Sequence, residues 1–175
     1  SEVEEVDKEV ERILDEARKA LKRVEERVRK SHEDIRREIK RVEEDLERSS
    51  REIREKLKDQ DRKLEELEKE SKTLKDDLDR IRKEVEKLTR DVEKRLRELM
   101  ERIKDEIRRV KEKLKRVTDA EKLKKLVEEL EKEIRRLVDE LDKLVRKHEE
   151  ELDRLRKRMD ELVKEHKKRL DDTAK

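Results

Sequence analysis

Residues 119–174, DAEKLKKLVEELEKEIRRLVDELDKLVRKHEEELDRLRKRMDELVKEHKKRLDDTA, carry an apolar residue at almost every third or fourth position. This spacing places the apolar side chains on one face of an α-helix. The face is aliphatic except at His148 and His166, which lie 18 residues apart. That separation equals about five turns at ~3.6 residues per turn, so both imidazoles lie on the same side of the helix.

The rest of the chain has the same character. Charged residues make up 64% of its 175 residues, and Gly, Pro, Cys, Phe, Trp and Tyr are all absent. Periodic aliphatic residues in such a composition indicate long helices or coiled coil rather than strands. Disorder is the alternative for so charged a chain. However, the 57 basic and 55 acidic residues nearly balance, and the apolar residues are periodic, so we predict an all-α protein.

Two short breaks divide the apolar pattern into three stripes. The first lies at Gln60, which two aspartates flank, and aspartate favours helix caps and tight turns. At the second break the apolar phase slips, and Thr118 with Glu121 has capping-box spacing, as does Ser1 with Glu4. We therefore predict a single domain over residues 1–175, with helices at about 2–58, 62–116 and 119–173 and turns near 59–61 and 117–119.

The polar positions of the three stripes coincide when the chain folds back at both breaks. Two predicted layers result, one of Ser31, Thr89 and His148 and the other of Ser49, Ser71 and His166. His32 and Ser50 adjoin these layers and are candidate extensions, with an exposed His32 as an equal alternative. The aliphatic positions coincide in the same way. The sequence therefore predicts a long, nearly straight, antiparallel up-down-up three-helix bundle.

The two predicted layers have a structural interpretation. A histidine can accept a hydrogen bond from one hydroxyl and donate to another. Because an unpaired buried polar group costs about 1–3 kcal/mol, such layers penalise any shifted register of the helices. Protonation of a histidine that must accept a hydrogen bond would break its layer. We therefore expect a modest loss of stability in acid.

Catalytic and metal-binding alternatives fit the pattern poorly. A serine–histidine dyad inside a closed core would lack a substrate cleft and an orienting carboxylate. Zinc requires three or four ligands, whereas each layer supplies one histidine. We therefore predict no enzyme activity, cofactor or metal. The net charge of +2, with both signs interspersed, argues against nucleic-acid and membrane partners. No targeting segment is recognisable, so the localisation is undetermined.

As a whole, the chain resembles de novo designed, parametrically built helical bundles with buried hydrogen-bond networks. The resemblance rests on the Glu, Lys, Arg and Asp surface, the aliphatic core and the two matched polar layers. It departs from that class in having no glycine in its turns. The resemblance implies a hyperstable, monomeric scaffold that requires no partner and has no natural activity.

Two alternatives remain at this point. The first is a structural coiled coil in which one continuous helix pairs with a second copy. The second is a module that binds a partner helix or self-associates through apolar residues outside the stripes. Those residues are Leu14, Ala20, Leu88, Met100, Leu137, Leu144 and Leu162.

Overall fold

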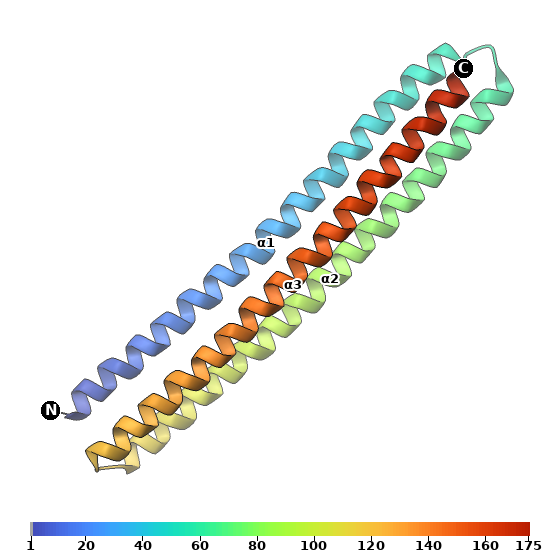
Figure 1. Ribbon diagram of the computed structural model, residues 1–175. Helices are drawn as coiled ribbons and strands as arrows, with labels where there is room; N and C mark the ends of the chain where they lie inside the picture. The colour runs from blue at the N-terminus through green and yellow to red at the C-terminus, as the bar shows by residue number, and fades with distance from the viewer. Residues whose placement is uncertain (1) are drawn as a thin grey trace. The chain divides into compact units, whose positions relative to one another are not determined.

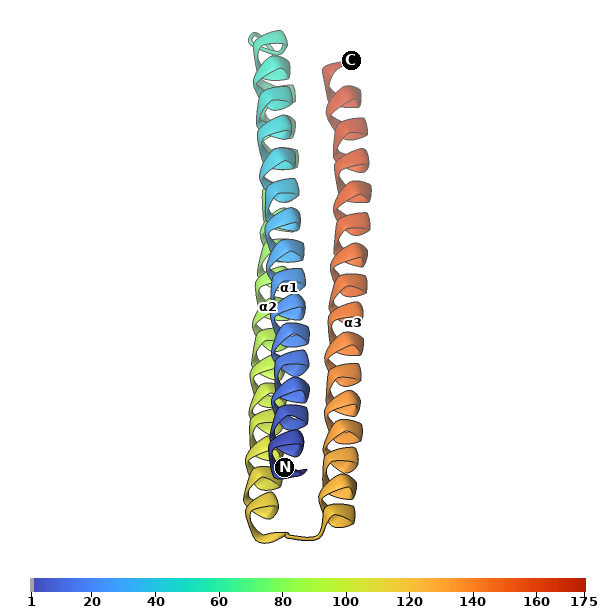
Figure 2. The same cartoon turned by 90° about the vertical axis from the view of Figure 1, so that its left-hand side faces the viewer.

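The computed structural model describes residues 2–175, with side chains from residue 4 onward, and contains three helices (Figures 1 and 2). They are α1 (Glu2–Lys56), α2 (Asp61–Arg116) and α3 (Ala120–Ala174). The predicted all-α, up-down-up three-helix bundle is confirmed. Glycine and proline, the strongest helix breakers, are absent from the sequence, so the helices continue uninterrupted between the turns. Ser1 of the first predicted capping box lies outside the described residues.

The first turn closes without glycine. The amide of Gln60 donates to the carbonyl of Leu57 at 2.8 Å, and the carbonyl of Gln60 then accepts from the amide of Leu64 at 3.1 Å. No residue in the described part of the chain has a positive φ. This turn therefore avoids the left-handed conformation that favours glycine. α1 ends two residues before the predicted boundary, and α2 begins one residue before it.

The second turn is capped by a different residue from the one predicted. Asp119 Oδ1 accepts a hydrogen bond from the amide of Glu121 at 3.1 Å, and the Asp119 carbonyl accepts from the amide of Leu123 at 3.0 Å. Asp119 is therefore the N-cap of α3, because the cap is the residue whose side chain bonds to the amide two or three positions later. The predicted cap, Thr118, lies one residue too early.

The chain divides into two compact units, and each helix contributes a segment to both. Unit 1 contains residues 1–29 and 90–148, and unit 2 contains residues 30–89 and 149–175. The prediction of a single domain was made from the continuity of the stripes and stays a prediction.

The core of unit 1 is aliphatic. Its most buried members include Leu99, Leu130 and Leu141, each at most 1% exposed. Burial of a leucine side chain contributes about 1.5–3 kcal/mol relative to leaving it in water. Several residues outside the predicted stripe also join this core: Leu137 is buried within it, while Leu14 and Leu144 pack against it. In this unit α1 and α3 thus bury a wider face than one narrow stripe.

Unit 2 has its own aliphatic core. Ile35, Val85 and Leu152, which the predicted register places at one level, are all buried, with exposed fractions of 2% or less. Leu88 and Leu162, which lie outside the predicted stripes, pack against this core. These leucines and their counterparts in unit 1 are therefore partly or fully covered within the single chain. This weakens the prediction that leftover apolar residues drive self-association.

The surface is charged, and its charges pair mainly along each helix. Arg12 contacts Glu16 at 2.8 Å and Arg136 contacts Glu140 at 2.7 Å, both with i,i+4 spacing. Exposed pairs of this kind contribute only a few tenths of a kcal/mol each. Searched over the described residues, no helix proves long and apolar enough to cross a membrane.

Candidate functional site: the buried polar positions

The most complete polar site lies in unit 2, around His166 of α3. The ring is 2% exposed. Its Nδ1 atom lies 3.4 Å from Glu70 Oε2, and its Nε2 atom lies 3.7 Å from Asp77 Oδ2. Both carboxylates belong to α2, seven residues apart, which places them on the same helix face about two turns from each other. His166 is thus bracketed by two acidic side chains.

The two carboxylates have further basic partners. Arg169 Nη1 lies 3.6 Å from Glu70 Oε2, and Arg80 Nη1 lies 3.4 Å from Asp77 Oδ1. Glu70 Oε2 is itself buried, and within the described residues neither it nor His166 Nδ1 makes a contact with hydrogen-bond geometry. The group is therefore held at ion-pair distances. A protonated imidazole could direct one N–H toward each carboxylate, whereas a neutral ring has a single N–H.

This arrangement differs from the predicted layer of Ser49, Ser71 and His166. The groups at ion-pair distance from the imidazole are carboxylates and not hydroxyls. A glutamate next to Ser71 has a longer side chain that reaches the ring from the edge of the core. The sequence signal was present, since Glu70 and Asp77 are one heptad apart and flank the level of His166.

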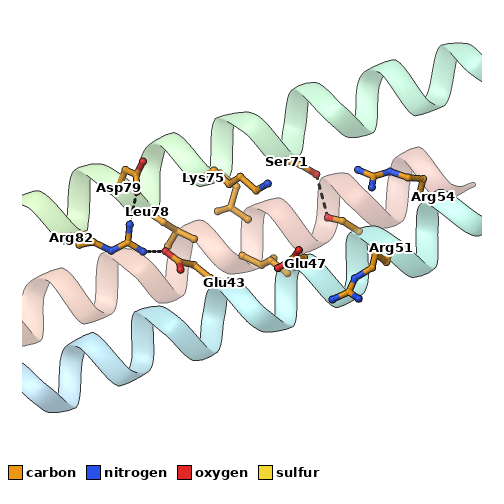
Figure 3. Close-up of a pocket in the computed structure, with 12 residues that line it drawn as sticks. Glu43, Glu47, Arg51, Arg54, Ser71, Lys75, Leu78, Asp79 and Arg82 are labelled. Carbon is orange, nitrogen blue, oxygen red and sulfur yellow. Dashed lines mark hydrogen bonds and ion pairs between the residues drawn. The ribbon is translucent and has the colours of Figure 1, made fainter.

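The serines of this level are placed differently from the prediction. Ser71 Oγ lies 3.2 Å from Ser50 Oγ, so the hydrogen-bonded hydroxyl pair joins α1 and α2 (Figure 3). Ser50, predicted as an extension of the layer, therefore takes the place expected for Ser49. Ser49 is half-buried. Ser49 and Ser50 are consecutive residues of α1, so their side chains point about 100° apart around the helix axis.

The second predicted set consists of Ser31, Thr89 and His148. Thr89 is 4% and His148 1% exposed, and Ser31 is half-buried. Ser31 and Thr89 belong to unit 2, while His148 belongs to unit 1. The Thr89 hydroxyl is buried without a hydrogen-bond partner among the described residues. The hydrogen-bonded layer of these three residues stays a prediction.

His32 is half-buried, with neither full exposure nor a place in the core. Its Nε2 atom lies 3.2 Å from Glu86 Oε1. The same oxygen is 3.8 Å from Arg36 Nε. All three residues belong to unit 2. His32 therefore joins α1 to α2 through a carboxylate, as His166 joins α3 to α2.

The chemistry open to these positions is limited by their partners. Each of these two histidines of unit 2 faces carboxylates, and the Ser50 and Ser71 hydroxyls face each other. A histidine activating a serine would instead lie within hydrogen-bond reach of its hydroxyl. Over the part of the chain that the structure describes, no group of three or more His, Asp or Glu side chains is arranged to hold a metal ion.

The strongest electrostatic perturbations lie on the exposed surface of unit 1. A side-chain hydrogen bond from Arg136 lowers the pKa of Glu133, and the attraction of the Arg136 charge adds to this effect against a small opposing cost of burial. A side-chain hydrogen bond from Arg12 lowers the pKa of Glu9 in the same way. Both pairs have i,i+3 spacing on one helix. Each pair stabilises one turn of its own helix.

Comparison with protein families gives one match. The family model described as CLIP1-like domain matches residues 51–175, which is more than half of the chain. Comparisons with the curated proteins and with the solved structures give no match.

Proposed function

The chain belongs to the CLIP1-like domain family, and we propose that it serves as a structural scaffold without catalytic activity. The observation that carries this proposal is that apolar residues of both units are buried within the chain itself. Residues inside the predicted stripes form the two cores, and leucines outside the stripes pack against them. A bundle built in this way supplies its own apolar partners and presents a charged surface. Such a surface favours solubility over association.

A finer proposal is that the scaffold is of designed type. The aliphatic core, the charged surface with balanced signs and the absence of aromatic residues support it. Such sequences specify one structure because propensity, periodicity and surface charge all favour the same fold. The polar contacts of His166 support a second part of the proposal, that buried polar groups fix the register. Sliding α3 by one turn would move the imidazole away from Glu70 and Asp77.

The scaffold proposal is tested by the concentration dependence of unfolding. We expect the thermal midpoint, followed by circular dichroism at 222 nm, to be unchanged between about 1 and about 100 µM protein, because a self-contained bundle needs no second copy. Light scattering should give the mass of a single chain over the same range. A midpoint that rises with concentration, together with a doubled mass, would instead establish the paired coiled coil.

A further inference from the structure

A groove runs between α1 and α2 in unit 2. It consists of two adjoining hollows of about 410 and 380 Å³ that share Glu43 and Arg82. We call it the α1–α2 groove, and it is lined by α1 residues between 36 and 54 and by α2 residues between 71 and 82. Nineteen residues of α1 correspond to about 28 Å of helix at ~1.5 Å per residue. The groove is therefore long enough for several turns of another helix.

The floor of the groove combines apolar residues with two small polar ones. Leu46, Leu74 and Leu78, each at most 5% exposed, form the base of the larger hollow, and the half-buried Ser50 and Ser71 lie beside them. The Ser50 and Ser71 hydroxyls meet 3.2 Å apart, and Figure 3 marks their hydrogen bond with a dashed line at Ser71. Space of this kind accepts an apolar side chain from a partner, as in the recognition of a helix in a groove.

The walls of the groove are basic. Seven of the residues that line the two hollows are Arg or Lys, and three are Glu or Asp. This excess is local, because the chain as a whole carries 57 basic and 55 acidic residues. Basic walls along a groove attract an acidic ligand and repel a basic one.

The basic residues are not equivalent along the groove. At one end Arg82 forms ion pairs with Glu43 and with Asp79. At the other end Arg51, Arg54 and Lys75 line the larger hollow with Ser50 and Ser71, and Figure 3 shows Lys75 and Arg54 on the two sides of Ser71. Within the described part of the chain, none of these three forms an ion pair with a carboxylate. Their charges are available to a ligand without the cost of breaking an existing pair.

We propose that the α1–α2 groove is a docking surface for an acidic amphipathic helix of a partner protein. Leucines of that helix would lie over Leu46, Leu74 and the serine hollow. Its glutamates would lie toward Arg51, Arg54 and Lys75. The helix would occupy the groove as a fourth member of unit 2, packing ridges into the groove between α1 and α2. This inference goes beyond the scaffold role and requires only that the bundle is folded.

The test uses the full chain and two fluorescein-labelled synthetic peptides of about 20 residues, which span about 30 Å as helices. Both peptides carry leucine at positions i, i+3, i+4 and i+7, and their polar positions are glutamate in one and lysine in the other. Fluorescence anisotropy measures binding at low salt. We expect the glutamate peptide to bind, the lysine peptide to remain free, and added salt to weaken the complex because the walls act through charge.

A matched pair of variants locates the contact. The groove variant is Arg51→Glu, Arg54→Glu and Lys75→Glu, and the control variant is Lys164→Glu, Lys167→Glu and Lys168→Glu, on exposed positions of α3 in the same unit. Both variants change the net charge equally. We expect the groove variant to bind the glutamate peptide about tenfold more weakly or worse, while the control variant keeps most of its affinity. Circular dichroism confirms that both variants remain helical.

Four results would overturn the inference. An equal loss of affinity for the glutamate peptide in both variants would mean that the peptide responds to the net charge of the chain. Equal binding of the glutamate and lysine peptides would mean that the groove walls do not select an acidic partner. No binding up to about 1 mM peptide would mean that the groove is no docking surface at any useful affinity. A doubled mass of the peptide-free chain, abolished in the groove variant, would assign the groove to a second copy. The last result would also contradict the scaffold proposal, whereas the first three leave it intact.

Discussion

The contact between His166 and Glu70 gives a prediction with a definite sign. The perturbation is a double-mutant cycle of His166→Leu and Glu70→Gln, which compares both single variants and the double variant with the unchanged chain. Because Glu70 Oε2 faces the ring nitrogen at ion-pair distance, we expect the two side chains together to stabilise the fold more than the sum of their separate contributions. The cycle removes the separate effects of placing leucine in the core and of neutralising the glutamate. What remains is the interaction between the two side chains.

The size of this interaction follows from the geometry. Nδ1 and Oε2 are 3.4 Å apart, and the Glu70 side chain is 29% exposed. Two unit charges about 4 Å apart attract by ~4 kcal/mol at an effective dielectric of ~20, but solvent and the nearby Arg169 reduce this value. We therefore expect a stabilising coupling of about 1 kcal/mol.

Urea denaturation followed at 222 nm measures the coupling, at a temperature where each transition is complete. With a slope of ~2 kcal/mol per M, a coupling of about 1 kcal/mol corresponds to a displacement of about 0.5 M. Glu68→Gln, an exposed neighbour on α2, provides the control and should be additive with His166→Leu. A coupling below ~0.3 kcal/mol for Glu70, or one as large for Glu68, would refute the contact between His166 and Glu70.

Three further predictions concern the helix ends, the core and the surface. Asp119→Ala should lower stability by about 1 kcal/mol because it removes the cap of α3, while Thr118→Ala should have almost no effect; thermal melts compare the two. Leu78→Ala, at a position 1% exposed, should cost about 2–5 kcal/mol in denaturant titrations, and a loss below ~1 kcal/mol would contradict the described packing. Arg136 holds the pKa of Glu133 below the ordinary glutamate value of about 4.5, so this pairing stabilises the fold fully above that pH and is lost as the pH falls through the lowered pKa. Glu133→Gln should therefore reduce the acid sensitivity slightly, as measured by melts between about pH 5 and about pH 3.

The predicted loss of stability in acid assumes that His166 accepts a hydrogen bond within a layer of hydroxyls. The structure places the carboxylates of Glu70 and Asp77 beside its ring instead. The acid sensitivity therefore stays a prediction that rests on the sequence alone.

The sequence by itself determined the number of helices, their approximate ends and the apolar face of each. These properties are local. The apolar residues recur every ~3.6 residues along a single helix, and the absence of glycine and proline affects each helix independently of the others. The matched positions also placed His148, Thr89 and His166 in the interior, where all three are buried.

Only the tertiary structure decided which side chains meet. It selected Asp119 over Thr118 as a cap, Ser50 over Ser49 as the partner of Ser71, and carboxylates over hydroxyls beside His166. The physical reason is that periodicity fixes a helix face to within about one residue, or ~100° of rotation. Whether a hydrogen bond or ion pair forms depends on changes of a few tenths of an ångström in the distance between donor and acceptor, and on the side-chain rotamers. Long charged side chains also reach from the surface to the core, so their place in the pattern does not reveal their partner.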